Sequence, residues 1–202
     1  MVISTIKWSL KERILKYLLE NKESKLSIRE ISRVLKSDYK NTFEAIKSFP
    51  KELIKMEKAG GSWIISLNLY SNKLLYLIES KRTEELLIRH PKLKLIQKEI
   101  QELAYPFVIV LVFGSYAKKL EDKNSDLDLC VISDSLNMLK EFEKRFGLST
   151  LKIELQEFST KEFTSMLEKR PRNLGHEIFK NNIILFGAEG YYNLISKWTM
   201  KE

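Results

Sequence analysis

The chain has 202 residues, of which 44% are apolar, with only seven glycines and four prolines. This composition excludes a low-complexity or largely disordered chain and leaves room for one large domain or two small ones. No stretch reaches the roughly 18 apolar residues of a membrane span, and the first ten residues lack a signal-peptide pattern. The single cysteine, Cys130, cannot form an internal disulfide. We therefore expect a cytoplasmic protein in a reducing compartment, with no membrane partner.

The net charge of +8 is concentrated in the first half of the chain. Residues 1–104 carry 21 Lys and Arg against 13 Asp and Glu, whereas residues 105–202 carry 14 of each. Such an asymmetry favours a polyanion-binding N-terminal module joined to a neutral C-terminal one. A lysine-rich chain without a binding role is the alternative that charge alone leaves open.

The first 70 residues predict two helices, a tight turn, a third helix and a two-stranded hairpin. Apolar residues recur at helical spacing after the N-cap residue Ser9, and again over residues 27–35, where the start matches a capping box. A third helical pattern covers residues 41–49, and a Gly60-Gly61 turn separates two strand-like runs. This order resembles a winged helix-turn-helix domain, and we assign residues 1–70 to it.

The winged-helix resemblance implies that the third helix enters the major groove of double-stranded DNA. Asparagine can pair with adenine there, and lysine can bind guanine or phosphate. A solvated helix face used for protein contacts or for a homodimer is the alternative. Lys55 is a further candidate phosphate contact beside the hairpin. The predicted DNA-binding residues are Tyr39, Lys40, Asn41, Thr42, Lys47 and Lys58.

Residues 71–91 are predicted to be a helical connector, and residues 92–202 a second domain. His90-Pro91 divides a Leu- and Ile-rich helical pattern in two, because proline disfavours a helical residue before it. An apolar run over residues 106–113 then predicts a buried strand. Gly114-Ser115 ends this run, and a glycine turn leaves room for backbone amides and a hydroxyl to approach a phosphate.

Two carboxylates follow Ser115 after a spacer of ten residues. In Asp126-Leu127-Asp128-Leu129 the side chains of a strand alternate, so both aspartates point to one face and both leucines to the core. Two carboxylates beside a phosphate-accepting turn are what a pair of Mg²⁺ ions bound to a nucleoside triphosphate requires. For the two aspartates alone, solvated strand-end carboxylates are the alternative.

A third carboxylate is predicted from the alternating pattern of residues 152–158. Ile153 and Leu155 form the natural inward pair, so Glu154 shares the face of the two aspartates if the strands are neighbours. Glu157 falls on the other parity and is the weaker candidate unless a bulge intervenes. Glu154 could reach a metal ion or act as the base for the acceptor's proton.

The segments Phe113-Gly114-Ser115-Tyr116-Ala117-Lys118 and Ser125-Asp126-Leu127-Asp128-Leu129 together resemble the signature of the DNA polymerase beta nucleotidyltransferase superfamily. The likeness is greater to its minimal archaeal and bacterial members. It implies an α/β (α+β) fold with a mixed sheet and flanking helices, and in-line attack of an acceptor on the α-phosphorus of a nucleoside triphosphate. It further implies that Asp126, Asp128 and Glu154 are catalytic and hold Mg²⁺, and that Gly114, Ser115 and Lys118 bind the nucleotide.

From this resemblance we predict an archaeal-type, Mg²⁺-dependent enzyme that transfers AMP from ATP to a protein or other acceptor. Minimal members often act as antitoxins that modify a toxin protein, which would then be a partner. The alternative is a DNA-binding regulator whose second domain binds nucleotide or has lost its activity. Two departures from the family pattern suggest that alternative: Lys119 stands where the family usually has glycine, and Glu154 where it has aspartate.

Overall fold

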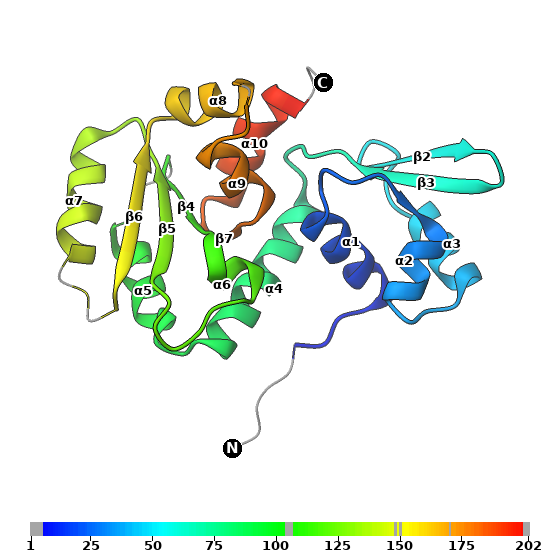
Figure 1. The fold of residues 1–202 in the computed structure, drawn as a ribbon, viewed down its shortest axis with the longest axis horizontal. Helices are drawn as coiled ribbons and strands as arrows, with labels where there is room; N and C mark the ends of the chain where they lie inside the picture. Colours follow the sequence, from blue (N-terminus) through cyan, green and yellow to red (C-terminus); the bar gives the residue numbers. More distant parts are fainter. Residues whose placement is uncertain (1–5, 104–106, 148, 150, 170, 200–202) are drawn as a thin grey trace. The chain divides into compact units, whose positions relative to one another are not determined.

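The computed structural model describes residues 6–103, 107–147, 149, 151–169 and 171–199. The chain divides into two compact units, one from Ile6 to Tyr70 and one that contains the chain from Ser71 onward (Figure 1). No helix in the described ranges combines the length and apolar character needed to cross a membrane.

Within residues 6–70, three helices pack with a small antiparallel sheet in the order β1-β3-β2. Ser9 accepts a hydrogen bond from the Glu12 amide (3.3 Å), and the Glu12 carboxylate accepts one from the Ser9 amide (2.8 Å), which fixes the start of the first helix. Ser27 and Asp38 cap the next two helices: the Ser27 side chain accepts a hydrogen bond from the Glu30 amide, and the Asp38 side chain accepts one from the Asn41 amide. The elements are α1 (Leu10–Glu20), β1 (Leu26–Ser27), α2 (Ile28–Val34), α3 (Tyr39–Lys47), β2 (Ile54–Ala59) and β3 (Ser62–Leu67).

The predicted apolar stripes of this unit are largely buried. Ile14 and Leu18 of α1 and Ile31 of α2 are at most 1% exposed. Val34, an apolar residue of the helical pattern predicted over residues 27–35, is instead 47% exposed; it is the last residue of α2. The two-residue strand β1 was not predicted, since two residues are too few to show an alternating pattern.

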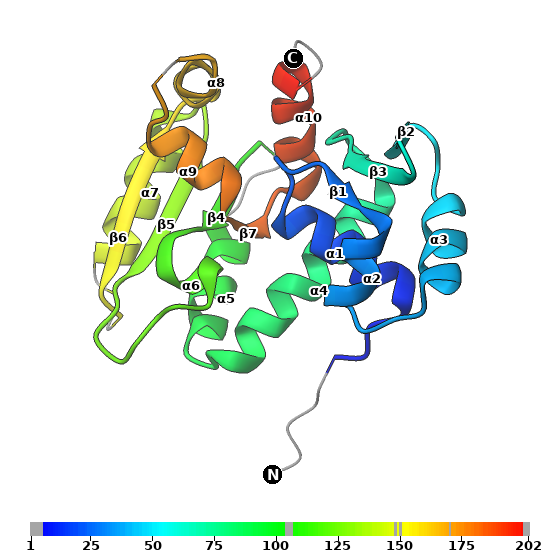
Figure 2. The same cartoon turned by 45° about the vertical axis from the view of Figure 1, so that its right-hand side comes forward.

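The unit that begins at Ser71 contains a mixed sheet in the order β6-β5-β4-β7. β5 and β6 are parallel, whereas β4 is antiparallel to both β5 and β7. Helices cover both faces: α5 and α7 pack on one, and α8, α9 and α10 lie on the other (Figures 1 and 2). The elements are α4 (Lys73–Arg89), α5 (Leu93–Leu103), β4 (Ile109–Val112), α6 (Gly114–Lys118), β5 (Leu127–Ile132), α7 (Leu136–Gly147), β6 (Ile153–Phe158), α8 (Thr160–Glu168), α9 (Leu174–Lys180), β7 (Ile183–Phe186) and α10 (Ala188–Thr199).

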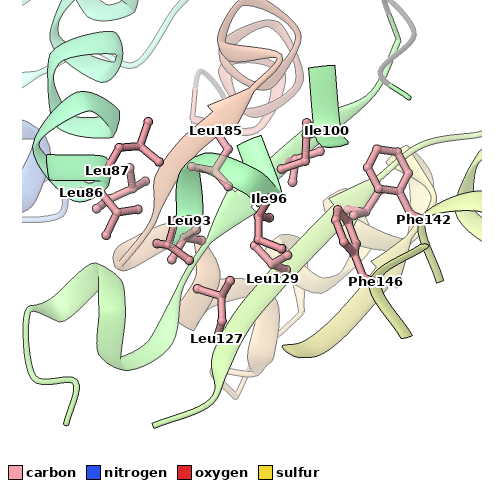
Figure 3. Close-up of a cluster of buried hydrophobic side chains, with 14 of the residues drawn as sticks. Leu86, Leu87, Leu93, Ile96, Ile100, Leu127, Leu129, Phe142, Phe146 and Leu185 are labelled. Carbon is pink, nitrogen blue, oxygen red and sulfur yellow. The ribbon is translucent and has the colours of Figure 1, made fainter. Parts of the chain in front are cut away.

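The main hydrophobic core lies between the sheet and the helices α5 and α7. Leu129 of β5 contributes to this core from the sheet, while Ile96 and Ile100 of α5 and Phe142 of α7 cover it (Figure 3). All four side chains are at most 4% exposed. The alternate residue Cys130 is buried on the opposite face of the sheet, and this burial raises the pKa of its thiol. Cys130 is therefore a packing residue, as the sequence predicts.

Helix α4 differs from the predicted connector, because it packs into the C-terminal unit. Arg82 lies within 2.7 Å of the Glu79 carboxylate and donates a 2.7 Å hydrogen bond to the Asn182 carbonyl oxygen. The Glu79 carboxylate also accepts a hydrogen bond from the Tyr192 hydroxyl (2.7 Å), and Thr83 donates to the Ile184 carbonyl oxygen (2.7 Å). These buried contacts join α4 to β7 and α10, so residues 71–91 form part of the C-terminal fold.

Candidate nucleotide and metal site

Gly114 lets the end of β4 approach β5 more closely than any other residue would allow. Its φ of +61° lies in the left-handed region, and a Cβ atom built on it would be 1.8 Å from Asp128 Oδ2. The Asp128 carboxylate also accepts a hydrogen bond from the Ser115 amide. The structure therefore brings together three of the predicted site residues: Gly114, Ser115 and Asp128.

The predicted carboxylates lie at one end of two neighbouring strands. Asp128 on β5 is in register with Glu154 on the parallel strand β6, and Asp126 directly precedes β5. Leu127 and Leu129 are buried on the other face, at 2% and 0% exposure. The strand alternation thus places Asp128 and Glu154 on a common face, as expected from the sequence.

This arrangement concentrates negative charge at Asp128. Burial and then the negative charge of Glu154 raise the pKa of the Asp128 carboxyl, and Asp126 adds to the effect. The Ser115 amide and the positive charge of Lys118 act in the opposite direction without reversing the shift. The ionised form of Asp128 is therefore disfavoured, first by burial and then by the neighbouring carboxylates, and a bound cation would offset both effects.

Asp126 forms an ion pair with Lys152, which directly precedes β6. Lys152 Nζ lies 2.6 Å from Asp126 Oδ2, and this hydrogen bond and the charge of Asp126 raise the pKa of Lys152. Because the Lys152 side chain is 81% exposed, the ion pair is a weak surface contact that another cation can displace. Asp126 Oδ1 is buried and has no hydrogen-bond partner within the described structure.

The two aspartates fit a divalent cation. In the conformation described, no group of three or more His, Cys, Asp or Glu side chains among the described residues is assembled to hold a metal ion. The partnerless oxygen of Asp126 and the unbalanced charge around Asp128 nevertheless supply the hard oxygen ligands that Mg²⁺ prefers. Glu154 is exposed beside them and contacts the Gln156 amide at 3.4 Å.

Glu157 lies on the opposite face of β6 from Glu154 and does not join the site. One of its carboxylate oxygens, Oε1, is buried and has no hydrogen-bond partner among the described residues. Burial, followed by the charge of Glu143 on α7, raises the pKa of Glu157. The parity argument that ranked Glu154 above Glu157 therefore agrees with the strand geometry.

Glu157→Gln is expected to make the protein more stable at pH 7. The raised pKa means that the folded state keeps a proton that the unfolded state releases near pH 4, so wild-type stability declines as pH rises through the raised pKa. Glutamine does not titrate, so the variant lacks this decline. Urea unfolding at pH 4 and pH 7 measures the free energy of unfolding of both proteins. The variant should be more stable than wild type at pH 7, and this difference should vanish towards pH 4. An equal difference at both pH values would contradict the assignment.

Lys118 and Lys119 close α6 in different ways. Lys118 forms an ion pair with Glu177 on α9, which lowers the pKa of Glu177, so its contact with a triphosphate requires an exchange of partners. Lys119 has φ 59° and ψ 37°, the left-handed conformation that ends many helices at glycine. The Leu120 amide donates to the Ser115 carbonyl oxygen (3.0 Å) and completes the turn. The backbone at Lys119 thus adopts the shape that glycine favours.

The effect of replacing Lys119 on the free energy of unfolding should therefore depend on how well the new residue tolerates the left-handed conformation. Lys119→Gly relieves left-handed strain of roughly 1–2 kcal/mol and loses part of that gain to unfolded-state entropy, so we expect a change between zero and about 1 kcal/mol in favour of folding. Lys119→Val should cost at least about 1 kcal/mol, because β-branched residues avoid this region. Urea unfolding of both variants tests the expectation. If glycine destabilised as much as valine, side-chain contacts of Lys119 would be responsible instead.

The predicted DNA-binding residues of the N-terminal unit are exposed with one exception. Thr42 is fully buried, and its hydroxyl bonds to the Asp38 carbonyl oxygen (2.8 Å) and to Ser37 Oγ (2.7 Å). Its prediction as a DNA contact is therefore wrong. Lys55 is exposed and pairs with Glu57 at 2.6 Å. The exposed candidates are Tyr39, Lys40, Asn41, Lys47 and Lys58.

The sequence did not predict three polar residues beside the site. Arg89 and His90, at the end of α4, contact Glu121 in the loop between α6 and β5. The His90-Pro91 pair predicts the end of a helix, but the local sequence does not indicate which loop that helix end contacts in the fold. A separate cavity of about 790 Å³ lies towards the other end of β5 and includes Phe107, Ser133 and Leu194 in its lining.

Comparison with known proteins finds similarity within the C-terminal unit. Residues 94–190 match the family model described as "Polymerase beta, Nucleotidyltransferase". The chain is 30% identical over 80 residues to a Methanocaldococcus jannaschii protein named "Putative protein adenylyltransferase". That match covers 40% of this chain and 56% of the relative, so the chain spans about half of the relative's length.

A chain from "Crystal structure of the toxin-antitoxin with AMP-PNP" is also similar in part. The sequence identity is 11% and the TM-score 0.33, over 55% of this chain and 86% of the other.

Proposed function

We propose that the C-terminal unit transfers a nucleoside monophosphate from a nucleoside triphosphate to an acceptor. The observation that carries the proposal is the close approach of Gly114 to Asp128, which brings the Ser115 amide next to one carboxylate of the aspartate pair. A turn that accepts phosphate and a carboxylate pair that accepts a cation are the two requirements of this chemistry.

In this proposal, each site residue has a distinct role. Ser115 positions the β- or γ-phosphate, and Lys118 adds positive charge when it leaves Glu177. Asp126 and Asp128 hold Mg²⁺, which when bound neutralises the triphosphate and lowers the pKa of the acceptor group. Displacement of Lys152 from Asp126 frees the second carboxylate for this role.

The proposed reaction makes one bond and breaks one. The acceptor's nucleophilic atom attacks the α-phosphorus in line, a new bond to phosphorus forms, and the α–β phosphoanhydride bond breaks. Pyrophosphate leaves with the bonding electrons. Glu154, exposed opposite Asp128, takes the acceptor's proton or completes the carboxylate set.

ATP as donor and a protein as acceptor are the preferred substrates. The name of the Methanocaldococcus jannaschii relative supports both, although the match covers 56% of that protein. A toxin protein is the kind of acceptor that minimal family members suggest.

Transfer can be tested with the full chain, Mg²⁺ and each of the four α-³²P-labelled nucleoside triphosphates, in the presence of proteins from the source cells. The proposal expects a labelled protein band with ATP, and no band when EDTA removes the metal. Label that stays on the nucleotide under every condition would contradict it.

We further propose that the N-terminal unit is a winged helix-turn-helix that binds double-stranded DNA. The order of helices and strands, the excess of six positive charges in residues 1–70, and the exposed Lys40, Asn41 and Lys47 support this proposal. Phosphate contacts release counterions, so affinity should fall steeply with salt.

A salt titration of duplex DNA affinity, followed by fluorescence anisotropy, tests DNA binding. Replacing both Lys40 and Lys47 with alanine is expected to reduce the log–log salt slope by about 2. Lys140→Ala in the C-terminal unit is the control and should leave the slope unchanged. Absent or salt-independent binding would contradict the proposal.

One observation favours a second candidate, a regulator that binds nucleotide without catalysis. Lys152 Nζ forms an ion pair with Asp126 Oδ2 at 2.6 Å. If this ion pair persisted in the presence of a metal ion, Asp126 could not serve as a metal ligand. Such a regulator would bind ATP, release no pyrophosphate and still bind DNA. Lys152→Ala distinguishes the two, because it would restore transfer only if the ion pair blocks the site.

A further inference from the structure

Three side chains hold the loop between the two halves of the site motif against the end of α4. Arg89 donates from Nε to Glu121 Oε1 and from Nη2 to the Tyr116 carbonyl oxygen, both at 3.0 Å. His90 Nε2 lies 2.5 Å from the same Glu121 oxygen, and its ring is 4.8 Å from the Tyr116 ring between centroids. We call Arg89, His90 and Glu121 the Glu121 clamp.

The clamp is built around a buried negative charge. The Glu121 side chain is 9% exposed, and its burial acts to raise its pKa. Hydrogen bonds from its own amide and from His90, together with the charge of Arg89, outweigh burial and hold the pKa of Glu121 below its usual value. A buried anion with two partners fixes their relative positions, because loss of either partner leaves the charge uncompensated.

The clamp stands on a rigid part of the fold. Pro91 disfavours a helical backbone at His90, whose φ is −126° and ψ 79°, so α4 ends at Arg89; the His90 ring packs against Tyr116 of α6. One turn earlier, Leu86 is fully buried in the main core (Figure 3). Thr83 ties the same helix to β7.

Helix α6, in contrast, depends on its neighbours for its position. It has five residues and no side-chain hydrogen bond at its N-cap, and so short a helix is not stable by itself. Tyr116 and Ala117 pack against the main core, and polar contacts add to this packing: Lys118 pairs with Glu177, and the Tyr116 carbonyl oxygen accepts from Arg89. Ser115 directly precedes Tyr116, so the clamp acts on the residue next to the predicted phosphate contact.

We propose that Arg89, His90 and Glu121 are positioning residues that fix α6, and through it the Gly114-Ser115 turn, for binding a nucleoside triphosphate. This inference rests on the proposed function. The clamp residues act through Tyr116 and not on the reacting atoms. Loss of the clamp therefore weakens nucleotide affinity more than it slows transfer at saturating nucleotide.

Calorimetric titration of the full chain with ATP in the presence of Mg²⁺ tests this role. Glu121→Ala and Arg89→Ala should each raise the Kd for ATP about tenfold, the loss in affinity expected when one hydrogen bond to a charged phosphate is misplaced. Arg89→Lys should give an intermediate loss, since a single ammonium replaces the planar fork that contacts both Glu121 and Tyr116. Glu121→Gln, which keeps the shape and the acceptor oxygen, replaces the alanine variant if that variant does not fold.

Arg145→Ala is the matched control. Arg145 is exposed to a similar extent as Arg89 (37% against 32%) and pairs with Glu99 and Glu102, away from the motif loop. Its loss should leave the Kd unchanged. If the wild-type chain binds ATP and the folded Glu121 and Arg89 variants bind it with the same Kd, the proposed role of the clamp is wrong while the proposed function stands. A wild-type chain that does not bind ATP with Mg²⁺ would overturn the proposed function and this role with it.

Discussion

Asp128→Asn is expected to lower the rate of nucleotidyl transfer at least about 1,000-fold, or ~4 kcal/mol in activation free energy. Asparagine preserves the shape beside Gly114 but removes the charge that would hold the proposed cation and that repels Glu154. The fold should persist, because the raised pKa of Asp128 indicates that its charge is unfavourable in the folded state. Initial rates with α-labelled ATP, together with thermal unfolding, measure both effects.

A matched pair of variants on β6 supplies the control. Glu154→Gln should reduce transfer, since Glu154 lies opposite Asp128 on the same face. Glu157→Gln should leave transfer unchanged, because Glu157 lies on the opposite face near α7. Equal activity of the Asp128→Asn variant and wild type would show that the chemistry occurs elsewhere.

Arg82→Ala is expected to destabilise the C-terminal unit by about 3–5 kcal/mol. The change leaves Glu79 buried and without its cationic partner, and it removes the hydrogen bond to the Asn182 carbonyl oxygen. Urea unfolding monitored by circular dichroism measures the loss. The paired replacement of Glu79 and Arg82 by methionine should recover most of it, because the buried charges are removed together.

Lys81→Ala, one position earlier on α4 and only partly buried, is the control for Arg82 and should cost less than about 1 kcal/mol. If Arg82→Ala were equally mild, α4 would not be anchored by the ion pair. Residues 71–91 would then behave as the connector that the sequence suggests.

The core of the site could be predicted from the sequence because it is local. Gly114-Ser115 and the Asp126-x-Asp128 pair lie on one short stretch, and strand alternation decides which side chains share a face. The same rule ranked Glu154 above Glu157 once the two strands proved to be neighbours. Short-range periodicity carries this much information without knowledge of the fold.

The parts that the sequence did not predict depend on contacts between distant segments. Glu79 and Arg82 have the polar character of a solvated helix face, yet tertiary packing buries them as a pair. Helix α7 was not predicted, although Phe142 and Phe146 are buried at i,i+4 spacing. Thr42 was assigned to the exposed face of α3, although it lies four residues before the buried Ile46.

The central claim is that nucleotide and metal bind at the Gly114-Ser115 turn and the aspartate pair. A crystal structure of the chain with Mg²⁺ and a non-hydrolysable ATP analogue tests it most directly. We predict that the triphosphate contacts Ser115, that the metal lies on Asp126 and Asp128, and that Lys152 has left Asp126. Nucleotide bound in the cavity near Ser133, or a site in which Lys152 still pairs with Asp126, would contradict the claim.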